Sequence, residues 1–177
     1  VQVLAFEQDT SDTTPPVTTS NIPSVWTKGP YQVILSAVDE SSTVDATYYS
    51  LDGNHPTTLY DPVNHFEVSA EGTTTVKYYS VDSALNEEEV VTELLRVDST
   101  PPVTTDDHQE MYIELATIDL YPTDALSGVA YTRYRLDGGM SISGTRVQTS
   151  VLGTHTVEYW SVDQAGNTET STSFQFR

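Results

Sequence analysis

Carboxylate side chains at the turns of this sequence are its clearest candidates for chemistry, because calcium binds to groups of oxygen ligands in such turns. Calcium takes about six to eight oxygens from carboxylates, Asn side chains and backbone carbonyls. The candidate ligands are Asp39, Asp82, Asp98, Asp124, Asp163 and Asn167. No loop has the spacing of an EF-hand. A second interpretation is therefore equally open, in which Asp163 and Asn167 hydrogen-bond their own backbone as Asx turns.

The residue types needed for catalysis do not form a recognisable set. The four histidines, His55, His65, His108 and His155, show no pair at metal-binding spacing, and we expect His155 to be exposed on its strand. There is no Gly-x-Ser-x-Gly motif, and no nucleophile can be matched with a base and an orienting acid. The chain contains no Cys, which excludes thiol catalysis, disulfides and Cys-zinc sites. We therefore expect no catalytic residues, no required cofactor and no enzyme.

Aromatic residues form a further candidate surface. They are Trp26, Tyr48, Tyr79, Tyr131 and Trp160. Aromatic rings can stack on the faces of sugars, but Tyr and Trp are also common strand residues. A glycan is thus one candidate ligand of this chain.

Charge excludes two classes of partner. The net charge is −19, from 26 acidic and 7 basic residues. Such a surface repels nucleic acids and anionic membranes, and no apolar run is long enough to cross a bilayer. Val1–Glu7 has no basic residues and is not an intact signal peptide. We expect neither nucleic-acid binding nor membrane insertion.

An internal duplication organises the chain. Asp12–Thr19 returns as Asp98–Thr105, Asp39–Gly53 aligns with Asp124–Gly138, and Gly72–Asp82 returns as Gly153–Asp163. Two copies in series indicate a spacer, stalk or fibre, because a duplicated enzyme would repeat a catalytic set. The predicted domains are residues 12–97 and 98–177, preceded by an N-terminal strand at 1–11.

Each copy shows short alternating runs broken by turn residues, which predicts antiparallel β-structure. The expected strands are Tyr31–Val38, Ala46–Leu51, Thr74–Val81 and Glu89–Val97, then Tyr112–Leu120, Ala130–Leu136, Thr154–Val162 and Thr170–Arg177. About seven short strands per copy fit an immunoglobulin-like sandwich. Tyr78 and Tyr159 precede a Ser by two positions, the spacing at which such domains place a Tyr before their second Cys. The predicted fold is all-β, with two tandem immunoglobulin-like β-sandwich domains after an N-terminal extended strand.

Paired prolines open both copies. Pro15-Pro16 and Pro101-Pro102 hold the chain extended and cannot join a central ladder. We therefore expect each pair to lead into an edge strand.

The N-terminal segment alternates apolar and polar residues, with Val1, Val3, Leu4 and Phe6 as its apolar positions. Three interpretations are open: the end of a preceding module, a loop-like terminus, or a donor strand. A donor strand would complete the second module of another copy and give a head-to-tail fibre. Under that interpretation the four apolar residues form a subunit interface.

Thr100–Thr105, Thr123–Gly139 and Gly153–Asn167 together resemble the bacterial immunoglobulin-like repeats of secreted and cell-surface proteins. Residues 12–97 depart from that pattern at Thr43 and at Ser83–Asn86. The resemblance implies a structural or adhesive role without catalysis, in an extracellular filament, stalk or adhesin. It also implies calcium ions at module junctions, and a homo-oligomer, glycan or host surface as partner. The alternative is an accessory carbohydrate-binding or spacer module of a secreted polysaccharide-degrading enzyme.

Overall fold

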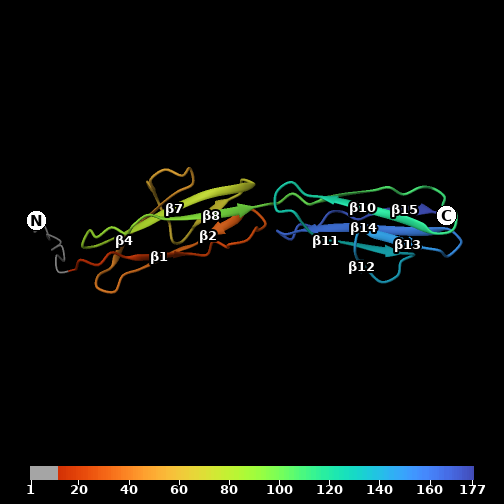
Figure 1. The fold of residues 1–177 in the computed structure, drawn as a ribbon. Coiled ribbons are helices and arrows are strands. Elements are labelled where there is room, and N and C mark those ends of the chain that lie inside the picture. Colours follow the sequence, from red (N-terminus) through yellow and green to blue (C-terminus); the bar gives the residue numbers. More distant parts are fainter. Residues whose placement is uncertain (1–11) are drawn as a thin grey trace, which may run out of the picture. The chain divides into compact units, whose positions relative to one another are not determined.

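The computed structural model describes residues 12–177, and every regular element in this range is a β-strand (Figure 1). None of the described elements is a helix able to cross a bilayer. The chain forms two compact units, described here as unit 1 (residues 12–25 and 29–97) and unit 2 (26–28 and 98–177). The predicted all-β class is confirmed.

Unit 1 consists of two layers of antiparallel strands. One layer is a four-stranded sheet in the order β5-β4-β7-β8, and the other consists of the pairs β1-β3 and β2-β6. The strands are β1 (Val17–Ser20), β2 (Tyr31–Val33), β3 (Leu35–Val38), β4 (Val44–Ser50), β5 (Thr58–Leu59), β6 (Phe66–Val68), β7 (Gly72–Asp82) and β8 (Val91–Val97).

The predicted strand over residues 31–38 is interrupted at Ile34, which separates β2 from β3. Asn21 bridges the interruption, because its amide donates to the Ile34 carbonyl and its side-chain oxygen accepts from the Ile34 amide. Val33 and Leu35 remain buried while Ile34 points outward, so the predicted alternation of faces is confirmed.

Unit 2 has the same plan with an unbroken strand in the equivalent place. Its sheets have the orders β13-β10-β9 and β12-β11-β14-β15. The strands are β9 (Val103–Asp106), β10 (Ala116–Thr123), β11 (Val129–Leu136), β12 (Ile142–Ser143), β13 (Arg146–Thr149), β14 (His155–Asp163) and β15 (Thr172–Phe176). Strands β1 and β9 follow the paired prolines and lie at sheet edges, as the prolines predict.

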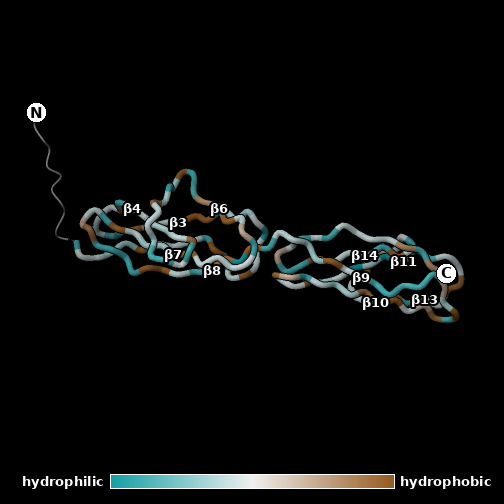
Figure 2. Tube along the Cα trace, turned by 90° about the horizontal axis from the view of Figure 1, so that it is seen from above, coloured by the Kyte–Doolittle hydropathy of each residue, from teal (hydrophilic) through white to brown (hydrophobic). Residues whose placement is uncertain are grey.

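Each unit buries its own hydrophobic core between its two layers. In unit 1 the core contains Val33, Leu35, Tyr60, Val68, Val76, Tyr78, Leu95 and Val97. In unit 2 it contains Ala116, Ile118, Leu120, Val147, Val157, Tyr159 and Phe176. Figure 2 shows hydrophobic and hydrophilic stretches alternating along the tube of both units. That alternation follows from the two-residue period of a strand with one buried face.

Candidate functional site

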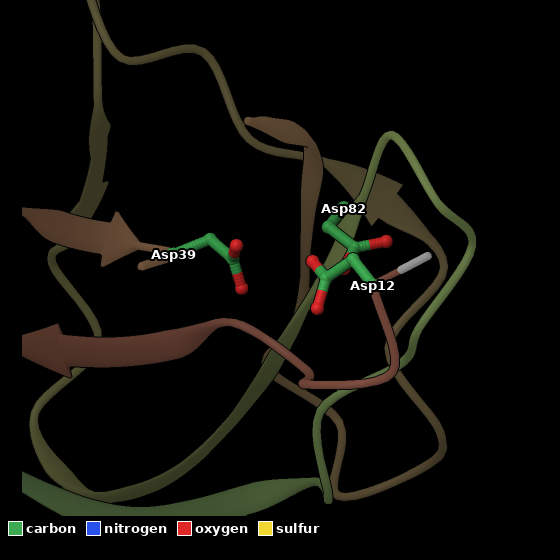
Figure 3. Close-up of side chains that lie close together, drawn as sticks. All are labelled: Asp12, Asp39 and Asp82. Atoms are coloured by element: carbon green, nitrogen blue, oxygen red, sulfur yellow. The ribbon is translucent and has the colours of Figure 1, made fainter. Parts of the chain in front are cut away.

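Three aspartates meet at one end of unit 1. Asp12 lies in the segment before Pro15, Asp39 follows the end of β3, and Asp82 is the last residue of β7. One carboxylate oxygen from each lies within 4.8 Å of the other two. Figure 3 shows the carboxylate of Asp39 reaching toward those of Asp12 and Asp82 from the opposite side. This group is called the unit 1 cluster below.

Local hydrogen bonds fix the orientation of each carboxylate through one of its oxygens. Asp12 Oδ1 accepts the Thr14 amide at 2.9 Å. Asp39 Oδ1 accepts the amides of Ser41 and Ser42 at 2.9 and 2.5 Å. These are Asx-type turns, which aspartates form readily after a strand or before a proline. The turn interpretation is therefore correct for these Oδ1 atoms.

The second oxygens of Asp12 and Asp39 have no hydrogen-bond partner, although both atoms are buried. Asp12 as a whole is only 8% exposed. Among residues 12–177, the ion pairs involve His108, Arg135, Arg146 and His155 with other carboxylates, so no cationic side chain pairs with this cluster. A buried carboxylate oxygen without a donor or a cation is costly in free energy.

The cluster stays acidic in its ionisation. Burial opposes ionisation of Asp39, but hydrogen bonds from the Ser42 and Ser41 amides outweigh it and lower its pKa below the usual value. Burial likewise opposes ionisation of Asp82, and the side chain and amide of Asn86 outweigh it, so this pKa is also lowered. Both groups therefore carry negative charge at neutral pH, and the charges repel each other at this separation.

Unit 2 repeats the arrangement with Asp98, Asp124 and Asp163, whose ligand atoms also lie within 4.8 Å of one another. Asp98 precedes Pro101, Asp124 follows β10, and Asp163 ends β14. Here Asp98 Oδ1 accepts the Thr100 amide and its Oδ2 accepts the Ser127 amide at 3.0 Å. Both oxygens of Asp98 thus have protein donors, unlike those of Asp12.

An asparagine orients the β7 or β14 aspartate in each unit. The Asn86 amide and side-chain nitrogen donate to the two oxygens of Asp82, each at 2.8 Å, and the side chain also reaches the Asp12 carbonyl at 3.2 Å. Asn167 makes the same three contacts with Asp163 and the Asp98 carbonyl. Because these asparagines donate toward the carboxylates, they act as supports rather than as oxygen ligands.

The turn that carries Asn86 has the same shape in both units despite its different sequence. Leu85 has a φ of 69°, and Gly166 at the equivalent place has a φ of 89°. The amide of each donates to the carbonyl of the preceding aspartate, Asp82 or Asp163, at 3.2 Å. The sequence departure at Ser83–Asn86 therefore changes the strain of the turn and not its hydrogen bonding.

Among the predicted ligands, Asp39 and Asp82 meet in unit 1, and Asp98, Asp124 and Asp163 meet in unit 2. Sequence reasoning missed Asp12 as a member of the unit 1 cluster. The signal was available, because Asp12 and Asp98 begin the same repeated motif before the paired prolines.

A buried network of hydroxyls and a glutamate was also missed. Ser80 Oγ lies 2.7 Å from the hydroxyls of Thr18 and Thr47. Glu88 accepts the Thr18 amide at 2.7 Å, the Thr18 hydroxyl, and the Ser80 amide at 3.2 Å. Unit 2 repeats the network with Thr104, Thr132, Ser161 and Glu169. The signal was the repeated spacing Asn86-x-Glu88 and Asn167-x-Glu169.

The expectation that His155 is exposed is wrong, since it is only 7% exposed. Its ring nitrogens lie 2.7 Å from Asp137 Oδ2 and 2.8 Å from the Val151 carbonyl. The Asp137 carboxylate, followed by the Val151 carbonyl, raises the pKa of His155. Asp137 comes from the Asp-Gly turn, so the tertiary structure turns this strand face inward where local alternation with Thr could not reveal it.

The aromatic candidates do not form one continuous strip. Tyr48 and Tyr79 stack in unit 1 with ring centroids 5.4 Å apart. In unit 2, Arg135 lies 5.1 Å from the ring of Trp160, and Arg133 lies 5.2 Å from that of Tyr131. The predicted interface residues Val1, Val3, Leu4 and Phe6 lie outside the described residues.

Comparison with known proteins agrees with the fold. Residues 24–92 match the family model of the chitobiase/beta-hexosaminidase C-terminal domain. A structure of fibronectin(III)-like modules of Clostridium thermocellum CbhA is similar at 16% identity and a TM-score of 0.48, covering 90% of this chain and 93% of that chain. The D00-D0 domain of intimin is similar at 11% identity and a TM-score of 0.42, covering 91% and 100%. No curated protein matches the sequence.

The resemblance to bacterial immunoglobulin-like modules is confirmed. The family match falls in the first copy, which departs more from the repeated pattern than residues 98–177 do. The shared sheet order of the two units explains this, because the fold depends on alternation and turns that both copies keep.

Proposed function

We propose that the chain is a structural spacer or adhesive stalk segment of a secreted or cell-surface protein. The observation that carries this proposal is the path of the chain through each unit. In unit 1 the leading residue Asp12 lies beside Asp82, the last residue of β7. The final residue Val97 pairs with Gly72, the first residue of β7. The chain therefore begins at one end of the unit and leaves at the other.

Unit 2 has the same path. Asp98 lies beside Asp163, the last residue of β14, and Phe176 pairs with His155, the first residue of that strand. A strand rises about 3.3 Å per residue, so the eleven residues of β7 cross about 36 Å. A unit that is crossed from end to end adds length to a chain with each repeat.

This path also suits a unit that bears force. The last strand of unit 1, β8, is hydrogen-bonded to β7 in register from Gly72↔Val97 to Tyr78↔Val91. A pull along β8 loads those hydrogen bonds together instead of opening them one at a time. The net charge of −19 supports the extracellular assignment, because it keeps an exposed repeat protein soluble.

Single-molecule stretching of the whole chain tests the proposal. We expect two unfolding events, each releasing about 240 Å, since roughly 80 residues extend to at most about 3.5 Å each and the folded path is subtracted. Leu95 is fully buried in the core of unit 1, so Leu95→Ala should weaken one event and leave the other as an internal reference. A chain that extends without resistance, or in one event only, would contradict a load-bearing spacer.

A second candidate is an accessory glycan-binding module, favoured by the stacked pair Tyr48 and Tyr79 on neighbouring strands. His55 packs edge-on against Tyr79 with centroids 5.2 Å apart and extends this aromatic group. Retention on insoluble chitin or cellulose that is lost in Tyr79→Ala would support this role. Retention that is equal in Tyr79→Ala and in the wild-type chain would count against it.

A further inference from the structure

The unit 1 cluster combines two features that point to a ligand from outside the chain. Three carboxylates converge within 4.8 Å, and the buried oxygens Asp12 Oδ2 and Asp39 Oδ2 have no donor. In Figure 3 the Asp12 carboxylate is directed toward Asp39 and not toward solvent. A positive ligand would satisfy these oxygens and cancel the repulsion between the carboxylates.

We propose that Asp12, Asp39 and Asp82 bind a calcium ion. The ligand atoms are all carboxylate oxygens, a hard donor set that suits calcium or magnesium and does not favour zinc or copper. Calcium is the better fit because the oxygens come from three separate segments, and calcium accepts flexible, irregular geometry where magnesium requires a near-ideal octahedron. Backbone carbonyls and water complete the coordination.

Such an ion would tie the segment before Pro15 to the body of unit 1. Asp12 belongs to that leading segment, whereas Asp39 and Asp82 end strands of the two opposite sheets. Apart from the ion, the side chain of Asn86, which donates to the Asp12 carbonyl at 3.2 Å, fixes this segment near the cluster. The inference does not depend on the proposed spacer role, because the site lies wholly within one unit.

Unit 2 serves as an internal comparison. There the Ser127 amide donates to Asp98 Oδ2, the atom that corresponds to the unpartnered Asp12 Oδ2. The protein itself thus supplies a donor that unit 1 lacks. The proposal is accordingly made for unit 1.

The test is calcium titration of the full chain, followed by calorimetry and by thermal melting in calcium, in magnesium and in a chelator. We expect calcium at about a hundredfold excess over its dissociation constant to raise the melting temperature of unit 1 by about 10 °C or more. Magnesium should have a much smaller effect. Asp12→Asn should abolish this rise, and Asp45→Asn, an exposed carboxylate in the same unit, should preserve it.

A second measurement separates ion binding from a folding defect. In chelator, Asp12→Asn should melt at or above the wild-type temperature, because it removes one of three repelling charges and keeps an oxygen for the Thr14 amide. The proposal is overturned if wild-type melting does not respond to millimolar calcium. It is equally overturned if Asp12→Asn binds calcium as tightly as the wild-type chain.

Discussion

Replacing Glu88 by alanine should remove the acceptor at the centre of the buried network in unit 1. The change leaves three donors without their partner, namely the amides of Thr18 and Ser80 and the Thr18 hydroxyl. Ser80 is completely buried, so water cannot replace the lost bond at its amide without opening the sandwich. At about 1 kcal/mol for each bond, the expected loss of folding free energy is about 3 kcal/mol.

The assay is thermal unfolding of the whole chain by calorimetry. A loss of about 3 kcal/mol lowers the melting temperature of a unit this size by about 12–24 °C, while unit 2 keeps its own network around Glu169. The melt should therefore split into an early transition and an unchanged one. Glu89→Ala is the matched control, because Glu89 is exposed and adjacent. If Glu88→Ala melts within about 2 °C of Glu89→Ala, the hydrogen bonds of Glu88 contribute nothing net and the reasoning is refuted.

Three further predictions follow from individual contacts. The Asp137 carboxylate raises the pKa of His155, so the stability that this pair gives unit 2 is complete below the usual value of 6.5 and is lost as pH rises through the raised pKa. Unfolding midpoints at pH 6 and pH 9 should differ in the wild-type chain and converge in His155→Gln, and an equal difference in both proteins would contradict the assignment. Leu85→Gly should stabilise unit 1 by about 1 kcal/mol, because Leu85 has a φ of 69° and is 65% exposed; denaturant unfolding measures this, and Gly166→Leu in unit 2 should have the opposite sign. Deleting residues 1–11 should prevent any head-to-tail fibres seen by electron microscopy if that segment is a donor strand, and fibres that persist would exclude donation.

Much of the architecture could be predicted from local patterns. The two-residue alternation of Tyr31–Val38 fixes which side chains face the core, and Val33 and Leu35 are buried as expected. The paired prolines predicted the edge positions of β1 and β9, because a proline has no amide hydrogen to give to a ladder. The break at Ile34 could not be predicted, since it depends on the distant side chain of Asn21.

The sequence by itself determined the strands, the duplication and the aspartates at the turns, because alternation, turn chemistry and repetition are local properties of the chain. Only the tertiary structure decided which aspartates meet, since Asp12, Asp39 and Asp82 are far apart in sequence and are brought together by the ends of two different sheets. It also decided which oxygens remain without donors, and it buried His155 against the turn of Asp137. Convergence of this kind arises from the packing of layers, which no local pattern encodes.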